Sequence, residues 1–366
     1  MKKNAPRIDL YVIALSYIKD IGPASIKKLT GAFGGAEAVF GASLKELSGI
    51  VGERRARAIK EFSDWERIEQ DLKRLPRDGV RIVCLEEEEY PAFLKEIANP
   101  PPFLYVKGSF IPEDRYAVAI VGTRNPTHYG TTQAEEIASQ LARMGFTIVS
   151  GFARGIDTAG HRGAVQAGGR TIAVLGSGID VPYPAENRHI VEKIASSGAV
   201  ISEFPPGTPP DRQNFPQRNR IISGLSLGVL VVEAAKDSGS LITAALALEQ
   251  GKEVFSIPGN ITSANSRGTN ELIKNGAKVV TGADDILEEL APVLKGFLKK
   301  PAGEKPMPEL SAGERRIVAV LGPEPRHVDE VAREIGMSAP DILTHLLSLE
   351  LKGVLKQTAG KKFFIC

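Results

Sequence analysis

From Tyr116 onward the chain alternates between short apolar runs rich in β-branched residues and longer amphipathic stretches. YAVAIVG is followed by TTQAEEIASQLARMG, and the alternation continues through FTIVSG, RTIAVLGSG, GVLVVEA and KEVFSIPG. Apolar runs of this kind are typical of strands buried on both faces, and parallel strands need helical crossovers between them. The pattern therefore predicts an α/β fold with an extended Rossmann-like parallel sheet covered by helices on both faces.

The flanks of this region follow other patterns. Before it, apolar residues recur at helical spacing and glycines interrupt them, which predicts a small helical domain similar to helix-hairpin-helix or SAM domains. After it, a segment rich in Lys, Pro and Gly precedes three helical patterns and a closing hairpin, which predicts a winged helix. The expected parts are a helical domain at 1–75, the Rossmann-like domain with its lead-in at 76–295, a linker at 296–309 and a winged-helix-like domain at 310–366.

Composition limits the possible functions. The 366 residues carry a formal net charge of only +2, so any nucleic-acid site must come from local clustering of cations. The two cysteines, Cys84 and Cys366, make neither a disulfide framework nor a metal quartet. No apolar run is long enough to span a membrane, and the N-terminus lacks a small-residue cleavage site. We expect a cytoplasmic protein without a membrane partner.

The turn after the first strand of the sheet excludes two common nucleotide sites. It reads GTRNPTHYG, from Gly122 to Gly130, where a dinucleotide site would have G-x-G-x-x-G. The second strand ends in Ser150-Gly151 instead of an acidic residue, and no P-loop motif occurs in the chain. The sequence therefore predicts no cofactor. It also predicts no metal and no catalytic residue, because no set of ligands and no nucleophile is spaced to suit them.

Four turns at equivalent positions carry small residues and arginines, and parallel strands bring such turns to the carboxyl edge of the sheet. Helix N-termini there offer free N–H groups, and guanidinium groups bind phosphate in bidentate fashion. Phe215 lies among the arginines, where an aromatic ring either stacks on a base or anchors the start of a helix. The predicted DNA- or phosphate-binding residues are Gly122, Thr123, Arg124, Gly151, Arg154, Gly155, Arg212, Asn214, Phe215, Arg218, Asn219, Arg220, Ser238, Gly239 and Ser240.

These motifs resemble those of the DNA-processing protein A (DprA/Smf) family. The resemblance covers residues 117–274 and includes AIVGTRNPTHYG, SGFARGIDTAGHRGAV, FPQRNRIISGLS and VVEAAKDSGSLITA. It implies a homodimer through the Rossmann-like domain that binds single-stranded DNA, protects incoming strands and helps load RecA recombinase in natural transformation. It also implies DNA contact at Arg124, Arg212 and Phe215; the family often has lysine at the second of these positions.

An enzyme remains the alternative, because the fold is also similar to lysine-decarboxylase-like nucleotide phosphoribohydrolases. Their catalytic glutamate falls on Thr243 in this chain. Other acids are Asp157, Asp180, Glu186, Glu203 and Glu233, for which capping and structural pairing are the commoner roles. His161 follows Asp157 by one helical turn, without a third ligand or a nucleophile spaced to suit catalysis.

Both flanking domains are weak candidates for DNA binding. The N-terminal turns Asp20-Ile21-Gly22 and Ile50-Val51-Gly52 each lack the first glycine of a helix-hairpin-helix turn. The expected recognition helix, Ala339 to Gly353, has acidic residues and one compensating cation, Lys352. This composition favours protein contact, although the run RRAR at 54–57 and the wing lysines Lys356, Lys361 and Lys362 keep weak DNA binding open.

Overall fold

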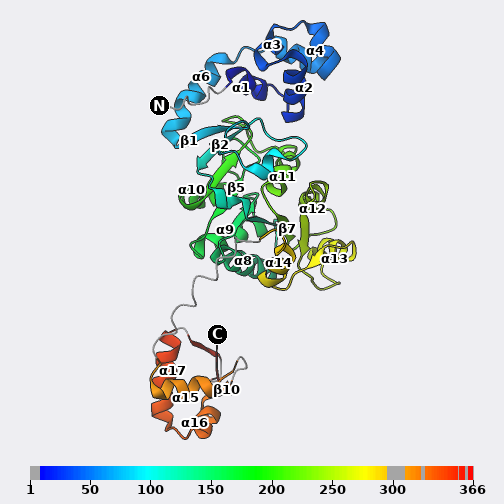
Figure 1. Ribbon diagram of the computed structural model, residues 1–366. Helices are drawn as coiled ribbons and strands as arrows, with labels where there is room; N and C mark the ends of the chain where they lie inside the picture. Colours follow the sequence, from blue (N-terminus) through cyan, green and yellow to red (C-terminus); the bar gives the residue numbers. More distant parts are fainter. Residues whose placement is uncertain (1–8, 295–309, 323–325, 353, 359–361, 366) are drawn as a thin grey trace. The chain divides into compact units, whose positions relative to one another are not determined.

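The structure is a computed structural model that describes residues 9–294, 310–322, 326–352, 354–358 and 362–365 (Figure 1). The chain divides into two compact units, Met1–Lys299 and Lys300–Cys366. The linker expected at 296–309 lies outside the described residues. The boundary expected near residue 75 falls within the first unit and stays a prediction. Within the described ranges, no helix is long and apolar enough to cross a bilayer.

A nine-stranded sheet forms the centre of the first unit, with strand order β1-β2-β6-β5-β4-β3-β7-β8-β9. Strands β6, β5, β4, β3, β7, β8 and β9 pair in parallel, in this spatial order. Strand β2 runs antiparallel to both of its neighbours, β1 and β6. The bounds are β1 Val80–Cys84, β2 Phe103–Gly108, β3 Ala117–Val121, β4 Thr147–Ser150, β5 Thr171–Val174, β6 Ala199–Ser202, β7 Gly228–Val231, β8 Glu253–Ser256 and β9 Lys278–Val279. The predicted Rossmann-like parallel sheet is confirmed.

The sheet is buried on both faces, as its continuous apolar runs predict. In β3, Ala117, Ala119 and Val121 belong to one core cluster, whereas Val118 and Ile120 belong to the other. Helices α11 and α12 pack in the first cluster, and α8, α9 and α14 pack in the second. The helices of this region are α7 Ala92–Lys95, α8 His128–Arg143, α9 Ile156–Gln166, α10 Val191–Ser197, α11 Asn214–Gly224, α12 Gly239–Glu249, α13 Arg267–Lys274 and α14 Ala283–Leu290.

The strand order reverses between β3 and β7. From β3 the chain proceeds through β4, β5 and β6 on one side and then returns to place β7 against the other side of β3. The loops that leave the carboxyl ends of β3 and β7 therefore diverge, and a crevice opens between them. This reversal positions the candidate site.

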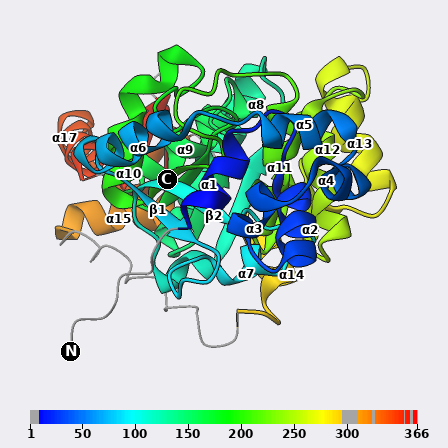
Figure 2. The same cartoon turned by 90° about the horizontal axis from the view of Figure 1, so that it is seen from above.

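Residues 10–74 form a bundle of short helices, which lies at the top of Figure 1 and spreads across the near side of Figure 2, from α6 on the left to α4 on the right. Their bounds are α1 Leu10–Tyr17, α2 Pro23–Phe33, α3 Ala36–Gly41, α4 Leu44–Val51, α5 Glu53–Lys60 and α6 Trp65–Arg74. Ile13 and Ile68 of this bundle share a core cluster with Phe103 of β2. Asp20 adopts a left-handed backbone conformation and pairs with Arg54 at 2.5 Å, so the first glycine turn is tied to the start of α5.

Among its described residues, the second unit has three helices and a three-stranded sheet of order β10-β12-β11. The bounds are α15 Ala312–Val320, α16 Val328–Ile335, α17 Ala339–Leu351, β10 Arg326–His327, β11 Leu355–Thr358 and β12 Lys362–Ile365. A core cluster that includes Ile317, Val331 and Leu346 joins the three helices. The order of elements is that of a winged helix, as predicted, with α17 at the position of the expected recognition helix.

Candidate nucleic-acid interface

A cavity of about 250 Å³ opens at the carboxyl edge of the sheet, where the strand order reverses. The turns after β3, β4 and β7 meet there beside the first two turns of α11, as the sequence predicts. The lining residues are Val121, Gly122, Arg124, Ala153, Asp157, Phe215, Pro216, Arg218, Asn219, Ile222, Ser238, Gly239, Ser240, Ile242 and Thr243.

An arginine and an aromatic ring lie together at the mouth of this cavity. The guanidinium carbon of Arg124 lies 4.8 Å from the centroid of the Phe215 ring, a cation–π arrangement. Arg124 is exposed and Phe215 is half-buried. A second, smaller cavity of about 140 Å³ adjoins the pair and is lined in part by Tyr183, whose ring centroid lies 6.2 Å from that of Phe215. The two cavities together present a cation and two aromatic rings on one surface.

Gly176, after β5, allows the Phe215 ring to occupy this position. A Cβ at residue 176 would come within 2.8 Å of the ring. The ring therefore rests against the Gly176 backbone while part of it stays accessible. The Phe215 ring can therefore both anchor the start of α11 and offer a surface on which a base stacks.

Arg218, one turn further along α11, is only 3 % exposed and lies inside the cavity wall. Its guanidinium donates hydrogen bonds to the carbonyl oxygens of Gly151 and Val174, while its Nε has no partner among the described residues. Burial lowers the pKa of Arg218 to about 10, so the side chain remains charged at neutral pH. The cavity wall therefore holds a permanent positive charge.

Asp157 is the acid nearest to this charge. It is 7 % exposed, and its carboxylate accepts a hydrogen bond from the Ala153 amide at 3.2 Å. Burial raises the pKa of Asp157, and the Arg218 charge opposes that shift. This carboxyl closes the turn before α9 and partly balances the buried guanidinium.

Most glycines of these turns are needed because other parts of the protein pack closely against them. They do not leave free space for a ligand. A Cβ at Gly122 would meet Ile156, and one at Gly151 would meet the Arg218 guanidinium. At Gly155, which has a φ of +76°, a Cβ would meet the carbonyl oxygen of Thr123. Gly239 differs, because it is exposed and has no atom within 4 Å of its Cβ position. Among these four glycines, only Gly239 leaves open space at the cavity.

Gly239 is the first residue of α12, and the N-terminus of that helix lines the cavity. The Ser238 hydroxyl caps it by accepting a hydrogen bond from the Ser240 amide. The positive end of the helix dipole and the nearby hydroxyl groups favour an anion at this position. Thr243, at the position of the catalytic glutamate in the enzyme alternative, is buried in the same wall.

The other predicted residues have different surroundings. Arg154 lines the smaller cavity and pairs with Glu186. Arg220 points to the other side of α11, where it pairs with the buried Glu203 at 2.6 Å. Arg212 is exposed on the loop before α11, outside the lining of both cavities. The remaining residues support the turns: Thr123 donates its amide to the Glu233 carbonyl, Asn214 donates to the Pro209 carbonyl and Asn219 donates to the Gly239 carbonyl.

The acids weighed for the enzyme alternative are engaged in structural contacts. The Glu233 carboxylate accepts hydrogen bonds from the amide and hydroxyl of Thr127, and Asp180 pairs with Arg74. His161 is completely buried, with its Nδ1 2.7 Å from the Thr171 hydroxyl. Burial lowers the pKa of His161 to about 3, so this imidazole is neutral. His161 does not line the cavity.

Sequence reasoning missed Tyr183, Gly176 and Ile242. Tyr183 stands between two prolines in VPYPAEN, and an aromatic residue in such a polar loop is a signal that could have been used. Gly176 gave no signal by itself, because its role depends on a ring 39 positions later in the chain, at Phe215. Ile242 is 43 % exposed on the first turn of α12, where helical periodicity does not distinguish it from a core residue.

The chain matches two family models in succession. Residues 81–291 match DNA recombination-mediator protein A, and residues 301–361 match the DprA winged helix domain. The first match alone spans more than half of the chain and includes every residue that lines the cavity. The chain belongs to the DprA/Smf family.

Two similar proteins come from different bacteria. The protein Smf of Synechocystis is 34 % identical over 96 % of this chain and 98 % of its own length. The protein Smf of Escherichia coli is 40 % identical over 80 % of this chain and 79 % of its own.

Two solved DprA structures share the fold. DNA processing protein A from Streptococcus pneumoniae superposes with a TM-score of 0.67 at 36 % identity, covering 77 % of this chain and 98 % of that one. DNA processing protein A from Helicobacter pylori, described for its single-stranded DNA binding mode, has a TM-score of 0.52 at 30 % identity. That match covers 58 % of this chain and 96 % of the H. pylori chain.

Proposed function

We propose that this DprA/Smf protein binds single-stranded DNA at the carboxyl edge of its sheet. The observation that carries the proposal is the exposed Arg124 guanidinium stacked on the Phe215 ring above a cavity with a buried cation. Single strands are held by cations along the backbone and by aromatic rings that stack on bases. The H. pylori relative described for single-stranded DNA binding supports the assignment.

Different parts of this surface contact the phosphate and the base of a nucleotide. The N-terminus of α12 and the charges of Arg124 and Arg218 attract a backbone phosphate to the cavity. A neighbouring base stacks on the accessible part of Phe215 or on Tyr183, 41 % of whose surface is exposed. Stacking requires an unpaired base, so a duplex is excluded from the aromatic part of this surface.

Binding of fluorescent oligonucleotides, measured by anisotropy at two salt concentrations, tests the proposal. We expect the full-length protein to bind a single strand at least tenfold more tightly than a duplex of the same sequence. Arg143, an exposed arginine at the end of α8, provides the matched control, and Arg143→Ala leaves affinity unchanged. Equal affinity for single and double strands would overturn the proposal.

The family resemblance extends the proposal to partners. We propose that the protein forms a homodimer through its Rossmann-like domain, acts in the cytoplasm and delivers bound strands to RecA in DNA processing and natural transformation. Light scattering of the purified protein measures the first point. RecA filament formation on strands that carry single-strand-binding protein, with and without this protein, measures delivery.

Binding without catalysis is part of the same proposal. The cavity lining contains one carboxyl group, Asp157, which is occupied by the Ala153 amide and the Arg218 charge. A release of free base from nucleoside monophosphates by the purified protein would show that the phosphoribohydrolase alternative holds instead.

A further inference from the structure

The buried wall of the cavity holds a guanidinium group with one edge unused. Arg218 donates hydrogen bonds from Nη1 to the carbonyl oxygens of Gly151 and Val174. Its Nε is buried without a partner, and its Nη2 has none either among the described residues. Nε and Nη2 share one edge of the guanidinium group, and such an edge binds two oxygens of a phosphate in bidentate fashion. Arg218 thus presents an anion-binding edge although only 3 % of the residue is exposed.

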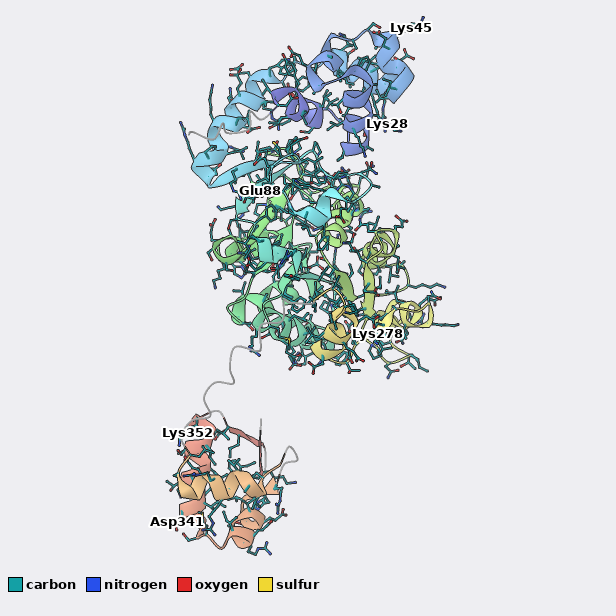
Figure 3. All side chains as sticks on the ribbon, in the orientation of Figure 1. Lys28, Lys45, Glu88, Lys278, Asp341 and Lys352 are labelled. Carbon is teal, nitrogen blue, oxygen red and sulfur yellow. The ribbon has the colours of Figure 1, made fainter. Side chains whose placement is uncertain are left out.

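The charge of Arg218 also lacks a direct counter-ion. Lys278, labelled in Figure 3, shows the commoner arrangement, because it pairs with Glu289 at 3.0 Å. Arg218 makes no such pair with any carboxylate of the described ranges. Asp157 influences its pKa, but the Asp157 carboxylate accepts a hydrogen bond from the Ala153 amide. A buried charge without a paired counter-ion is costly, so the cavity favours an anion that supplies one.

The N-terminus of α12 adds donors to the same cavity. The amide of Gly239, the first residue of the helix, has no hydrogen-bond partner in the part of the chain that the structure describes. No atom lies within 4 Å of the Cβ position of Gly239, so a ligand can approach this amide. The Asn219 side chain, next to Arg218 in the chain, donates to the Gly239 carbonyl at 3.4 Å. The free amide and the free guanidinium edge are therefore close neighbours in one wall.

We propose that the cavity binds a phosphate monoester, either at the end of a DNA strand or on a free nucleoside monophosphate. A monoester has three terminal oxygens and nearly two negative charges at neutral pH. Two of these oxygens match the Arg218 edge, and the third matches the Gly239 amide at the positive end of the α12 dipole. A phosphodiester within a strand has two terminal oxygens and one charge, so it satisfies only one of the two sets of donors.

The size of the cavity also favours the end of a chain. Its volume of about 250 Å³ is below the roughly 300 to 1,000 Å³ of pockets that enclose a whole small molecule. A phosphate inside a strand would have to bring two sugars past Arg124 and Phe215, which lie together at the mouth. A terminal phosphate brings one. Internal phosphates therefore stay at the exposed Arg124 guanidinium, and the terminal phosphate reaches Arg218.

For a strand, this inference rests on the proposed function, because Phe215 and Arg124 hold the nucleotides that follow the terminal phosphate. Fluorescence anisotropy on the full-length protein tests it with one oligonucleotide, labelled at its 3′ end, whose 5′ end carries a phosphate or a methyl phosphate ester. The methyl ester keeps the phosphorus and one charge but has only two terminal oxygens. We expect the 5′-phosphate strand to bind about tenfold more tightly, the effect of one hydrogen bond to a charged group.

Deoxyadenosine monophosphate tests the second source of the monoester. It is added to the complex with the labelled methyl-ester strand, and deoxyadenosine is the control without phosphate. Displacement by the monophosphate alone assigns the cavity to free nucleotides, and preference for the phosphorylated strand without displacement assigns it to strand ends. Equal affinity for the two strands together with no displacement would overturn the inference. The proposed function would still stand in that case, because it requires only that single strands bind more tightly than duplexes.

Two substitutions of Gly239 separate its amide from the shape of the cavity. Proline removes the amide hydrogen and is well tolerated at the first position of a helix, and Ser238 before it already has the extended backbone that proline requires. Alanine adds a Cβ in the same open space and keeps the donor. We expect the ratio of affinities for the 5′-phosphate and methyl-ester strands to be about fivefold lower in Gly239→Pro than in Gly239→Ala. Equal ratios in the two variants, both shown to be folded by urea denaturation, would overturn the assignment of the third oxygen to this amide.

Discussion

The cavity at the carboxyl edge of the sheet and the exposed side of α17 occupy the positions where their respective folds usually meet ligands. They differ in what their cations contact. At the cavity, Arg124 lies over an aromatic ring and Arg218 bonds to neutral carbonyl groups. At α17, the single lysine pairs with the carboxylate of Glu314. Position in the fold thus indicates where a ligand could bind, and the partners of each charge decide whether an anion is attracted there.

The buried end of the cavity gives the largest expected effect. Arg218→Met keeps the approximate shape of the side chain but leaves the carbonyls of Gly151 and Val174 without donors and Asp157 without its nearby cation. We expect the free energy of unfolding to fall by about 3 to 5 kcal/mol, measured by urea denaturation. Adding Asp157→Asn should recover part of the loss. A variant as stable as the original chain would show that Arg218 does not support the cavity.

The two units of the chain should lose stability at different pH values, and the first unit should be the more sensitive to acid. The folded pKa of His161 lies far below that of an unfolded histidine, so the unfolded state binds more protons below pH 6.5 and stability falls as pH decreases toward 3. The loss amounts to about 2 kcal/mol between pH 6.5 and 4.5. Urea denaturation of the original chain and of His161→Gln at several pH values measures it. The variant should lose this pH dependence.

The winged helix should respond only to stronger acid. Hydrogen bonds from Lys352 and Ser348 are the main causes that lower the pKa of Glu314 to about 2. A carboxyl group with a lowered pKa stabilises the fold above its unfolded pKa, and this contribution disappears as pH falls from about 4.5 toward 2. Side-chain NMR signals of the second unit, followed during acid titration, check this order. Loss of the winged-helix signals above pH 5 would contradict the expected order, in which the first unit responds to acid before the winged helix.

Substitutions at the mouth of the cavity should affect DNA binding more than stability. Arg124→Ala is expected to weaken single-strand affinity about tenfold and to reduce the salt dependence by about one unit of slope, since one phosphate contact is lost. Phe215→Leu should cost about 1 to 3 kcal/mol of binding without changing the slope, because stacking involves no counterion release. Anisotropy titrations at several salt concentrations distinguish the two variants. An equal change of slope in both would contradict the division between phosphate and base.

The smallest effect is expected at the wing. Lys362 is exposed on β12, and Lys362→Ala should change affinity for single strands by less than about 0.3 kcal/mol. The same anisotropy assay measures it. A loss comparable to that of Arg124→Ala would show that both regions hold DNA and would remove the contrast between them.

Much of the architecture could be predicted from local patterns. Buried strands separated by crossover helices specify a parallel sheet, and the carboxyl edge of such a sheet collects its turns, so Arg124, Phe215 and Gly239 could be placed together before the structure was known. The different contacts of Arg218 and Arg220 could not be predicted in this way. The two residues lie two positions apart on α11 and point to opposite sides, one into the cavity wall and the other to Glu203.

The sequence by itself determined the order of the elements, the family and the edge of the sheet where the site lies, because periodicity and turn chemistry are local properties of the chain. Only the tertiary structure decided which cations remain able to attract an anion and which contacts require glycine in the turns. Lys352 meets Glu314 across 38 positions of sequence, and the Phe215 ring rests on Gly176 across 39. Contacts between distant segments depend on how the helices pack, and no local pattern records them.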